Sequence, residues 1–237
     1  MAKNYTDHNK YFFKSIADEF EQLDNQYDVT TRKNIVFNEF LSNMHLEGMT
    51  ILDAGCGYGA FSVELKKYNC RLVSSDLIYE LTSKTVNKTK ETGVVSDALF
   101  LPFFDNSFDL VVTSEMVEHT PNPEAVIFEL IRVLKPGGHF VLTTPNKKWQ
   151  FVVRLASTLH LRNFNGIENF LGFRQLDMIL KKANVETISH KGLHLFPFQI
   201  KFLWKLSTFF DRRFGDKLLG EFMINQAVFC KKPISGE

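Results

Sequence analysis

A run of alternating glycines that follows an apolar segment constrains this chain more than any other feature of its sequence. Thr-Ile-Leu at residues 50–52 is typical of a buried parallel strand, and Gly55, Gly57 and Gly59 come soon after it. Glycine tolerates backbone conformations and close contacts that other residues do not, so these positions allow a sharp turn against a ligand before a helix opens at Phe61. The pattern predicts a nucleotide-cofactor loop between a strand and a helix.

Two classes of cofactor fit these glycines. Gly55, Gly57 and Ala60 satisfy the relaxed dinucleotide fingerprint, which keeps an NAD-linked oxidoreductase or epimerase as an alternative. Asp53 is more decisive, because its carboxylate would lie beside the pyrophosphate of a dinucleotide and repel it in a water-poor cleft. S-Adenosylmethionine carries an ammonium and a sulfonium and no phosphate, so this acid favours it. A glycine-rich turn that binds nothing is the third alternative.

Two further acids stand at the ends of predicted strands. Asp76 closes the strand at residues 71–76, where a carboxylate can accept hydrogen bonds from both hydroxyls of a ribose. Asp97 follows a short strand that ends near Val95. Either acid alone also suits a helix cap or a surface turn, because Asp favours both positions. Together with Asp53, they favour one cofactor site at the ends of the strands.

The segment from Ile51 to Asn146 closely resembles class I S-adenosylmethionine-dependent methyltransferases. The resemblance rests on the D-x-G-x-G-x-G motif that begins at Asp53, on the stretch SDALFLPF at residues 96–103, and on the strand, helix and LKPGG turn that follow Phe108. Each piece alone is weak, but the combination is highly specific. The small-molecule enzymes of quinone and menaquinone biosynthesis resemble this chain most, and they imply a Rossmann-like fold.

The resemblance implies a set of cofactor-binding residues. Asp76 would bind the ribose, and the side chain of Asp97 would accept a hydrogen bond from the exocyclic amine of adenine. The backbone amide of Ala98 would address a ring nitrogen, and Glu115 would bind the methionine ammonium. The expected cofactor-binding residues are Asp53, Gly55, Cys56, Gly57, Gly59, Asp76, Leu77, Asp97, Ala98, Ser114 and Glu115.

Glu118 and His119 are the candidate catalytic residues. Methyl transfer from a sulfonium depends largely on holding the acceptor close and in line. A phenol or alcohol is a poor nucleophile, and a carboxylate or imidazole near the sulfonium could take its proton. Glu118 and His119 follow the predicted strand at residues 108–113 and stand where such a base could act. Helix capping or a structural imidazole is the alternative for His119.

A metal site is an alternative for the same residues. Glu115, Glu118 and His119 resemble an arrangement that helps to hold a divalent ion in some quinone-biosynthesis O-methyltransferases and RNA-end 2′-O-methyltransferases. Such oxygen-rich ligation would suit Mg²⁺ that activates an acceptor hydroxyl. No fourth ligand is identifiable, and the remaining candidates are His160, His190 and His194. A divalent metal is therefore not expected.

Composition and charge exclude several functional classes. The 237 residues include 28 Lys and Arg against 27 Asp and Glu, so the chain has no electrostatic footprint for nucleic acid. Cys56, Cys70 and Cys230 form no C-x-x-C pair, which indicates reduced thiols rather than disulfides or a zinc site. The N-terminus lacks the apolar core of a signal peptide, and no apolar run reaches about 18 residues. We therefore expect a cytoplasmic protein.

Residues 1–45 are expected to form an N-terminal helical cover, because apolar residues recur there at helical spacing. In similar enzymes an aromatic residue near Tyr11 and a basic residue near Arg32 can touch the methionine half of the cofactor. A core position for Tyr11 and a solvated Arg32 are the alternatives.

Residues 147–237 are expected to supply acceptor-side insertions and the final strands. Within residues 193–210, bulky apolar residues recur at helical spacing with lysines between them. This segment could cover a lipophilic acceptor or make peripheral contact with a membrane, and simple packing on the sheet is the alternative.

We therefore predict an α/β fold, with a doubly wound, mostly parallel seven-stranded sheet, an antiparallel last strand, an N-terminal helical cover and a C-terminal helical insertion. Residues 46–146 would form the S-adenosylmethionine-binding core between the cover and the acceptor-side segments of the same domain. The predicted function is methyl transfer from S-adenosylmethionine to a small or lipophilic acceptor, with oxygen preferred and carbon or nitrogen open. A methyltransferase-like binding subunit without activity is the non-enzyme alternative.

Overall fold

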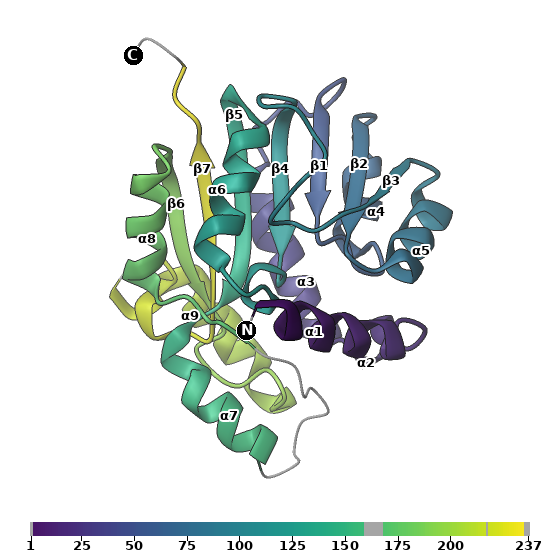
Figure 1. Cartoon of the computed structure of the whole chain (residues 1–237). Coiled ribbons are helices and arrows are strands. Elements are labelled where there is room, and N and C mark those ends of the chain that lie inside the picture. Colours follow the sequence, from purple (N-terminus) through teal and green to yellow (C-terminus); the bar gives the residue numbers. More distant parts are fainter. Residues whose placement is uncertain (1, 159–167, 217, 235–237) are drawn as a thin grey trace.

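A seven-stranded β-sheet runs through the molecule in the order β3-β2-β1-β4-β5-β7-β6 (Figure 1). The computed structural model describes residues 2–158, 168–216 and 218–234. The strands are β1 (Thr50–Ala54), β2 (Arg71–Asp76), β3 (Thr92–Val95), β4 (Phe108–Ser114), β5 (Leu134–Pro145), β6 (Glu186–Leu193) and β7 (Asn225–Lys231). Strands β1 to β5 pair in parallel, and β7 lies antiparallel between β5 and β6. The predicted sheet, with its antiparallel last strand, is confirmed.

The direction in which strands are added reverses beside β1. The chain moves outward from β1 to β2 and β3, and then returns to the other side of β1 to form β4 and β5. In open α/β sheets, the carboxyl ends of the strands at such a reversal border a crevice where ligands bind. The residues that follow β1 and β4 therefore meet at one edge of the sheet.

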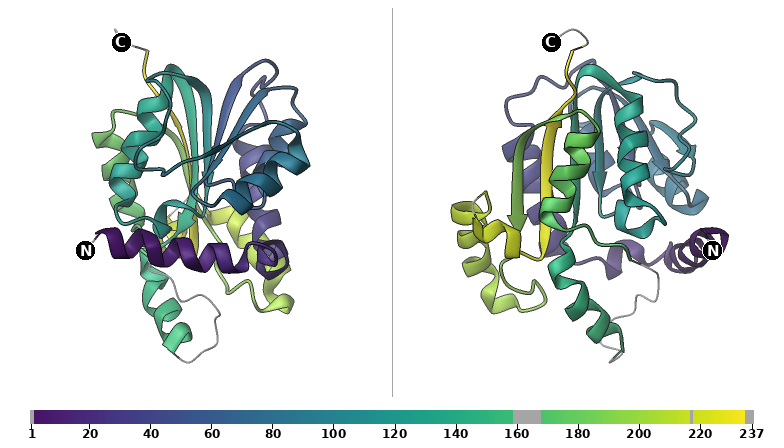
Figure 2. Two further views of the ribbon diagram at one scale, coloured as in Figure 1. Left: turned by 45° about the vertical axis from the view of Figure 1, so that its right-hand side comes forward. Right: turned by 60° about the vertical axis from the view of Figure 1, so that its left-hand side comes forward.

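Helices cover both faces of the sheet (Figure 2). The α-helices are α1 (Ala2–Ile16), α2 (Phe20–Leu23), α3 (Gln26–Ile35), α4 (Ala60–Lys66), α5 (Tyr79–Thr89), α6 (Pro123–Val133), α7 (Gln150–Thr158), α8 (Phe173–Lys182) and α9 (Trp204–Phe214). Short 3₁₀ or π turns occupy Val36–Phe40, Val117–His119, Lys147–Trp149, Lys201–Leu203 and Leu218–Phe222. Helix α6 begins at Pro123 because two residues favour a helix start there. Asn122 caps the helix, since its Oδ1 atom accepts a hydrogen bond from the Ala125 amide at 3.1 Å, and Pro123 occupies the first turn.

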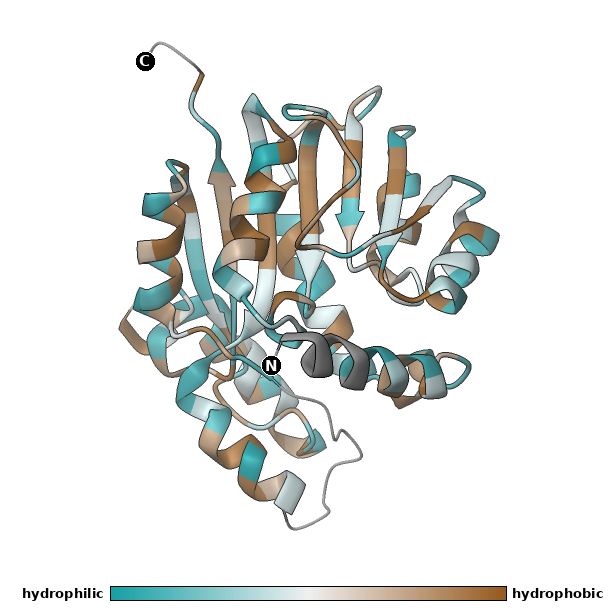
Figure 3. Ribbon diagram, viewed as in Figure 1, coloured by the Kyte–Doolittle hydropathy of each residue, from teal (hydrophilic) through white to brown (hydrophobic). Residues whose placement is uncertain are grey.

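Side chains of the central strands point alternately to the two faces of the sheet, and this divides the core into two layers. Leu52 of β1 and Val111 of β4 belong to the layer under α6 and α8. Ile51 and Leu110 belong to the opposite layer, together with residues of α3 and α4. Successive side chains of a strand point to opposite faces, so strands buried on both sides carry consecutive apolar residues, as the brown stretches of the central strands show (Figure 3).

The N-terminal helices α1 and α2 lie across the carboxyl edge of the sheet (Figures 1 and 2). Between them, Ala17 packs on Ile78 and Leu81, and its carbonyl oxygen accepts a hydrogen bond from Lys84 Nζ at 2.8 Å. The chain after α3, unlike α1 and α2, belongs to the core, because Val36 is fully buried beside the sheet. The first 45 residues thus supply both a cover over the edge and part of the core.

The helices near the C-terminus bury few side chains. Among the described residues, α7 has none that is buried, and in α9 only Ser207 and Asp211 are buried. The large apolar side chains Phe202, Leu206 and Phe209 are exposed. Packing on the sheet, the simple alternative for residues 193–210, therefore does not account for these three apolar side chains. In the part of the chain that the structure describes, no helix has the length and apolar character needed to span a bilayer.

Candidate cofactor and acceptor site

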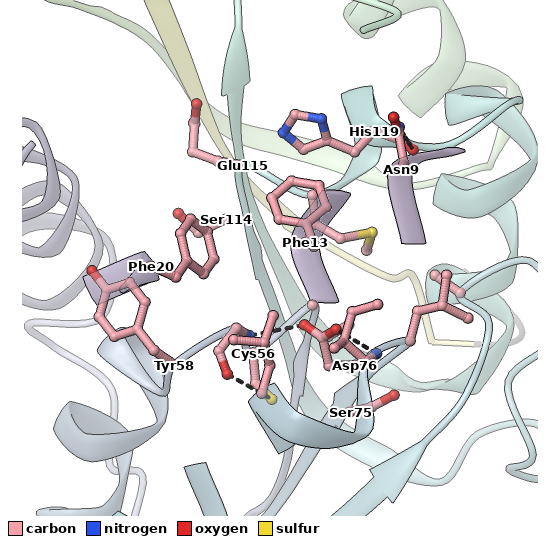
Figure 4. A pocket seen from close by; sticks show the side chains of 18 of the residues that line it. Asn9, Phe13, Phe20, Cys56, Tyr58, Ser75, Asp76, Ser114, Glu115 and His119 are labelled. Atoms are coloured by element: carbon pink, nitrogen blue, oxygen red, sulfur yellow. Dashed lines mark hydrogen bonds between the residues drawn. The ribbon is translucent and has the colours of Figure 1, made fainter. Parts of the chain in front are cut away.

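A cavity of about 500 Å³ opens at the carboxyl edge of the sheet, between the strand ends and the N-terminal helices (Figure 4). Ten of the eleven predicted cofactor-binding residues line it, namely Asp53, Gly55, Cys56, Gly57, Asp76, Leu77, Asp97, Ala98, Ser114 and Glu115. His119 lines the cavity as well. Two predicted site residues that the structure describes, Gly59 and Glu118, do not.

The glycine loop has a left-handed backbone at each glycine. Gly55, Gly57 and Gly59 have φ angles of 73°, 52° and 90°. A Cβ atom on Gly55 would lie 2.3 Å from Met116 Cγ, so a side chain there would collide with the chain that follows β4. A Cβ atom on Gly59 would lie 2.9 Å from Thr85 Oγ1 of α5. Gly59 is therefore explained by packing between helices rather than by contact with the cavity.

Asp76 fixes the loop from the end of β2. Its Oδ2 atom accepts a hydrogen bond from the Gly57 amide at 2.9 Å, and its Oδ1 atom accepts one from the Ile78 amide at 2.9 Å (Figure 4). Burial raises the pKa of Asp76, and these backbone amides oppose the rise. The carboxylate is thus held at the cavity wall, and each of its oxygens can accept a further hydrogen bond from a ligand hydroxyl.

Asp97 and Ala98 line the cavity just beyond β3. The Asp97 Oδ1 atom accepts a hydrogen bond from the Leu99 amide at 2.9 Å, which orients the side chain in a turn. Leu77 and Leu101 add apolar surface to the same cavity. An oriented acceptor combined with apolar walls can bind a planar heterocycle that carries an amine.

Asp53 is 2% exposed and lies behind the glycine loop. Its Oδ2 atom accepts a hydrogen bond from Ser62 Oγ of α4 at 2.5 Å, and Ser62 Oγ lies 2.9 Å from Ser74 Oγ of β2. Burial raises the pKa of Asp53 to about 7, with a smaller contribution from the charge of Asp76 and with Ser62 opposing the rise. Asp53 therefore joins β1 to α4 as well as bordering the cavity.

Glu115 follows β4 with an unusual backbone conformation. Its φ of 52° lies in the left-handed region that residues with side chains rarely adopt. Thr143 contacts it twice, because the Thr143 carbonyl oxygen accepts from the Glu115 amide at 2.9 Å and the Thr143 hydroxyl donates to Oε1 at 3.1 Å. Burial raises the pKa of Glu115 to about 8, although the charge of Arg32 opposes the rise. This acid is therefore mostly neutral at pH 7 when the cavity holds no cation.

Arg32 of α3 is 5% exposed and lines the cavity, so the solvated position that was its alternative is wrong. Its Nε and Nη2 atoms lie 2.9 Å and 2.8 Å from Asp28 Oδ2, and its Nη1 atom donates to Ser114 Oγ at 2.7 Å. Burial opposes the charge of Arg32, but Asp28, Glu115 and Asp24 raise its pKa. Asp24 and Asp28 were missed in the sequence, where the spacing of Asp28 and Arg32 by one helical turn was the only signal.

His119 lies against aromatic side chains of α1. The ring of Phe13 packs edge-on against the imidazole, with centroids 5.0 Å apart and an interplanar angle of 75° (Figure 4). Asn9 Nδ2 donates a hydrogen bond to the His119 carbonyl oxygen at 2.8 Å. Tyr11, by contrast, is 75% exposed and is not among the residues that line the cavity, so neither a contact of Tyr11 with the cofactor nor the alternative core position is supported.

Glu118 lies behind His119 and is 1% exposed. Its Oε2 atom accepts a hydrogen bond from Thr144 Oγ1 at 3.0 Å, and its Oε1 atom lies 3.8 Å from His119 Nε2. Burial, together with the nearby Glu115, raises the pKa of Glu118 well above its ordinary value. Glu118 therefore lies behind the imidazole and does not face an acceptor in the cavity.

The structure does not assemble a metal centre from the described residues. No group of three or more His, Cys, Asp or Glu side chains among them could hold a metal ion. His160 lies outside the described residues. The ring of His190 stacks on Phe173 and its Nδ1 atom lies 2.7 Å from Asp177 Oδ1, while His194 contacts Asp28.

Residues 26–190 match the model of a protein family described as a methyltransferase domain. The match covers more than half of the chain. The chain belongs to this methyltransferase family. The identification with class I S-adenosylmethionine-dependent methyltransferases, made from the sequence, is thereby confirmed, and the dinucleotide-binding alternative receives no support.

Curated relatives of this chain are named for different acceptors. It is 32% identical over 142 residues to a ubiquinone biosynthesis O-methyltransferase of Xanthomonas euvesicatoria, with 57% of this chain and 59% of the relative covered. It is 37% identical over 153 residues to a sarcosine/dimethylglycine N-methyltransferase of Halorhodospira halochloris, with 60% and 54% covered. It is 28% identical over 199 residues to the biotin biosynthesis bifunctional protein BioHC of Teredinibacter turnerae, with 76% and 35% covered. The chain thus spans less than two thirds of the length of each of these relatives.

A solved structure with the same fold is the magnesium protoporphyrin IX methyltransferase of Synechocystis, determined with bound S-adenosylhomocysteine. It superposes with a TM-score of 0.69 at 16% sequence identity and covers 96% of this chain and 99% of that one. At this identity the likeness concerns the fold alone.

The raised pKa of Glu115 leads to a prediction about stability. A carboxyl whose pKa rises on folding, here from 4.5 to about 8, contributes stability at low pH that is lost as the pH rises through this range. Glutamine does not titrate. We therefore expect the unfolding free energy of Glu115→Gln, relative to the wild type, to increase by about 1 kcal/mol or more between about pH 5 and about pH 8. Urea unfolding of the ligand-free proteins measures this difference.

Glu64→Gln is the matched control for this measurement. Burial would raise the pKa of Glu64, but Lys67 and Lys33 outweigh it and lower the pKa. Because folding lowers the pKa of Glu64 below its ordinary value of 4.5, the linked change in stability falls almost entirely below about pH 5, and its difference from the wild type should stay nearly flat above that pH. A flat difference for Glu115→Gln as well would contradict the raised pKa of Glu115.

Proposed function

We propose that this protein transfers a methyl group from S-adenosylmethionine to an oxygen atom of a small or lipophilic acceptor. The observation that carries the proposal is a single cavity lined by Asp76, Asp97 and Glu115 and also by a histidine, His119. The acids fit the ribose, adenine and ammonium of one cofactor, and the histidine fits the proton of an acceptor. Membership of a methyltransferase family supports the reaction class.

Three parts of the cavity suit three parts of the cofactor. The fixed carboxylate of Asp76 would accept hydrogen bonds from the ribose hydroxyls, and Asp97 with Ala98 would bind the adenine. The amino-acid end would lie toward Arg32 and Glu115, where a buried guanidinium lies close to a half-buried acid with a raised pKa. An ammonium beside Glu115 would favour ionisation of this acid, and the ligand carboxylate would pair with Arg32. When bound, S-adenosylmethionine supplies an electrophilic methyl group on a positively charged sulfur.

The acceptor would enter from the side of α1. Phe12, Phe13 and Ile16 provide apolar surface to the cavity, and Asn9 and His119 provide polar groups. Such a wall favours a flat apolar acceptor with one polar substituent. His119 would take the proton of an acceptor hydroxyl, which is why oxygen is preferred. An amine that is neutral at working pH would need no base, so nitrogen is the second candidate, and an N-methyltransferase among the relatives favours it.

The first test of this proposal is calorimetric titration of the full chain with S-adenosylhomocysteine. We expect a dissociation constant in the micromolar range, about 8 kcal/mol, because the cavity is already formed. Asp76→Ala should weaken binding by about tenfold or more, since it removes charged acceptors for the ribose and frees the Gly57 amide.

Asp18→Ala is the control for Asp76→Ala. Asp18 is exposed and pairs with Lys84 outside the cavity, so its loss should leave the dissociation constant unchanged. Absence of S-adenosylhomocysteine binding by the intact protein would overturn the proposed function, and NADH titrated in parallel would show whether a dinucleotide binds instead.

The proposed role of His119 predicts a selective loss of turnover. His119→Gln should lower kcat for a phenolic or quinol acceptor by about 10²–10⁴-fold, because no general base then accepts the proton. Binding of S-adenosylhomocysteine should remain close to that of the wild type. The exposed His45 provides the control variant His45→Gln, which should keep full activity. An unchanged kcat for His119→Gln would contradict the base and favour a nitrogen or carbon acceptor.

The segment 193–210 is proposed to contact a membrane surface peripherally. Phe202 is 84% exposed, and Phe209 and Leu206 are exposed as well, with Lys201 and Lys205 close to them in sequence. Apolar side chains flanked by basic ones suit the boundary of an anionic bilayer. A lipophilic acceptor could then reach the protein from the bilayer.

Co-sedimentation with phosphatidylglycerol vesicles at low salt tests this contact. We expect the wild type to pellet with the vesicles and Phe202→Asp/Phe209→Asp to remain in the supernatant, because the charges oppose insertion. Phe104→Asp changes an equally exposed phenylalanine elsewhere and should pellet like the wild type. No binding by the wild type, or equal binding by all three, would remove the membrane proposal.

A further inference from the structure

Arg32, which lines the cavity, pairs with the carboxylate of Asp28, and this carboxylate has a second partner on its far side. Both contacts from Arg32 to Asp28, at 2.9 Å and 2.8 Å, are made to Oδ2. The other oxygen, Oδ1, lies 2.8 Å from His194 Nε2 and 3.4 Å from Asn225 Nδ2. Asp28 therefore bridges a residue of the cavity and two residues that are not among those lining it.

His194 is fully buried and held in a constrained position. It follows β6 with a φ of 62°, and its imidazole has no exposed surface. The rings of Tyr27 and Phe198 lie 5.5 Å and 5.1 Å from it, measured between centroids. Its backbone carbonyl oxygen accepts a hydrogen bond from the Ile224 amide at 3.1 Å. The ring is thus fixed from several sides at a distance from Asp28 that suits a hydrogen bond.

The ionisation state of Asp28 determines which of the two atoms carries the hydrogen in this hydrogen bond. Burial would raise the pKa of Asp28, but Arg32 and His194 outweigh it and lower the pKa to about 2. Asp28 is therefore an ionised acceptor at neutral pH, and His194 Nε2 must carry the hydrogen. The Nδ1 atom has no hydrogen-bond partner within the described part of the chain.

We infer that His194 is a positioning residue for the cofactor, which acts through Asp28 to hold Arg32 where the amino-acid end of S-adenosylmethionine binds. The inference rests on the proposed function. The hydrogen bond from His194 fixes the rotation of the Asp28 carboxylate, so that Oδ2 faces Arg32. The guanidinium then keeps its remaining nitrogen for Ser114 and the cavity. Without His194, one oxygen of a buried carboxylate loses its strongest donor, and the carboxylate can turn away from Arg32.

A second contact joins the same two parts of the chain. Tyr27, next to Asp28 in α3, stacks on Trp204 of α9 with centroids 4.4 Å apart and an interplanar angle of 3°. Its hydroxyl donates to the Trp204 carbonyl oxygen at 2.9 Å. The loop that begins at His194 leads into α9. The segment from His194 to α9 therefore contacts α3 at two points. The position of this segment is thus linked to the binding of the amino-acid end of the cofactor.

Two ligands separate this role from a general loss of structure. S-Adenosylhomocysteine carries the amino-acid end, whereas 5′-methylthioadenosine has the same adenosine without it. Calorimetric titration of the full chain should show His194→Leu weakening S-adenosylhomocysteine by about tenfold or more while 5′-methylthioadenosine binds as to the wild type. His194→Gln can still donate to Asp28 and should recover most of the affinity. In activity assays, the KM for S-adenosylmethionine should rise in His194→Leu with a smaller change in kcat.

His190→Leu is the matched control, because His190 lies on β6, the strand that leads to His194, and its imidazole contacts Asp177 rather than Asp28. It should bind S-adenosylhomocysteine like the wild type. If His194→Leu fails to fold in a thermal unfolding assay, Asp28→Asn replaces it and should show the same selective loss. Equal weakening of both ligands, or no weakening of either, in a folded variant would overturn the inference. Absence of S-adenosylhomocysteine binding by the wild type would instead reject the proposed function.

Discussion

The hydrogen bonds that tie the loop after β1 to the end of β2 determine the rest of the site. The amides of Gly55 and Cys56 donate to the Ser75 carbonyl oxygen at 2.7 Å and 2.9 Å, and the amide of Gly57 donates to Asp76 at 2.9 Å. Parallel strands in register end side by side, so the loop reaches these acceptors without bending either strand. Left-handed glycines let the amides point toward β2. The carboxylate of Asp76 is thereby oriented before any ligand arrives, which lowers the entropic cost of binding.

Buried acids give the cavity an electrostatic character that a neutral or anionic ligand would not match. Burial raises the pKa of Asp53 to about 7 and that of Glu115 to about 8. Each acid would ionise more readily beside a cation, so a positively charged ligand gains free energy that a neutral one does not. Arg32 supplies one buried positive charge close to Glu115, and its pKa is raised. A ligand with both an ammonium and a carboxylate fits this pair of opposite requirements.

Backbone geometry made part of this site readable from the sequence. Gly55 and Gly57 were predictable because a turn at a strand end needs positive φ, and Asp76 because it closes a strand beside that turn. The mostly parallel seven-stranded sheet and its antiparallel last strand followed from a family resemblance carried by the same segment. The burial of Glu118 was harder to predict. The spacing after β4 places this residue at the carboxyl edge of the sheet but does not tell which side of the 3₁₀ turn is buried.

Contacts between distant segments were beyond reach of the sequence. His194 and Asp28 are 166 positions apart, and their hydrogen bond depends on how the end of β6 meets α3. Neither residue belongs to a periodic pattern that points to the other. The exposure of Tyr11 was equally hidden, because helical spacing in α1 shows that one face is apolar without showing which aromatic residue turns toward the cavity.

The match to the methyltransferase family covers only part of the cavity wall. The match to the methyltransferase family spans residues 26–190 and so includes the glycine loop and all three strand-end acids. It leaves out α1, which carries Phe12 and Phe13, and the segment from His194 through α9. The strand ends that line the cavity therefore fall within the family match, whereas α1, which lines the cavity from another side, falls outside it. Because the curated relatives include proteins named for oxygen and for nitrogen acceptors, membership of the family does not by itself fix the acceptor.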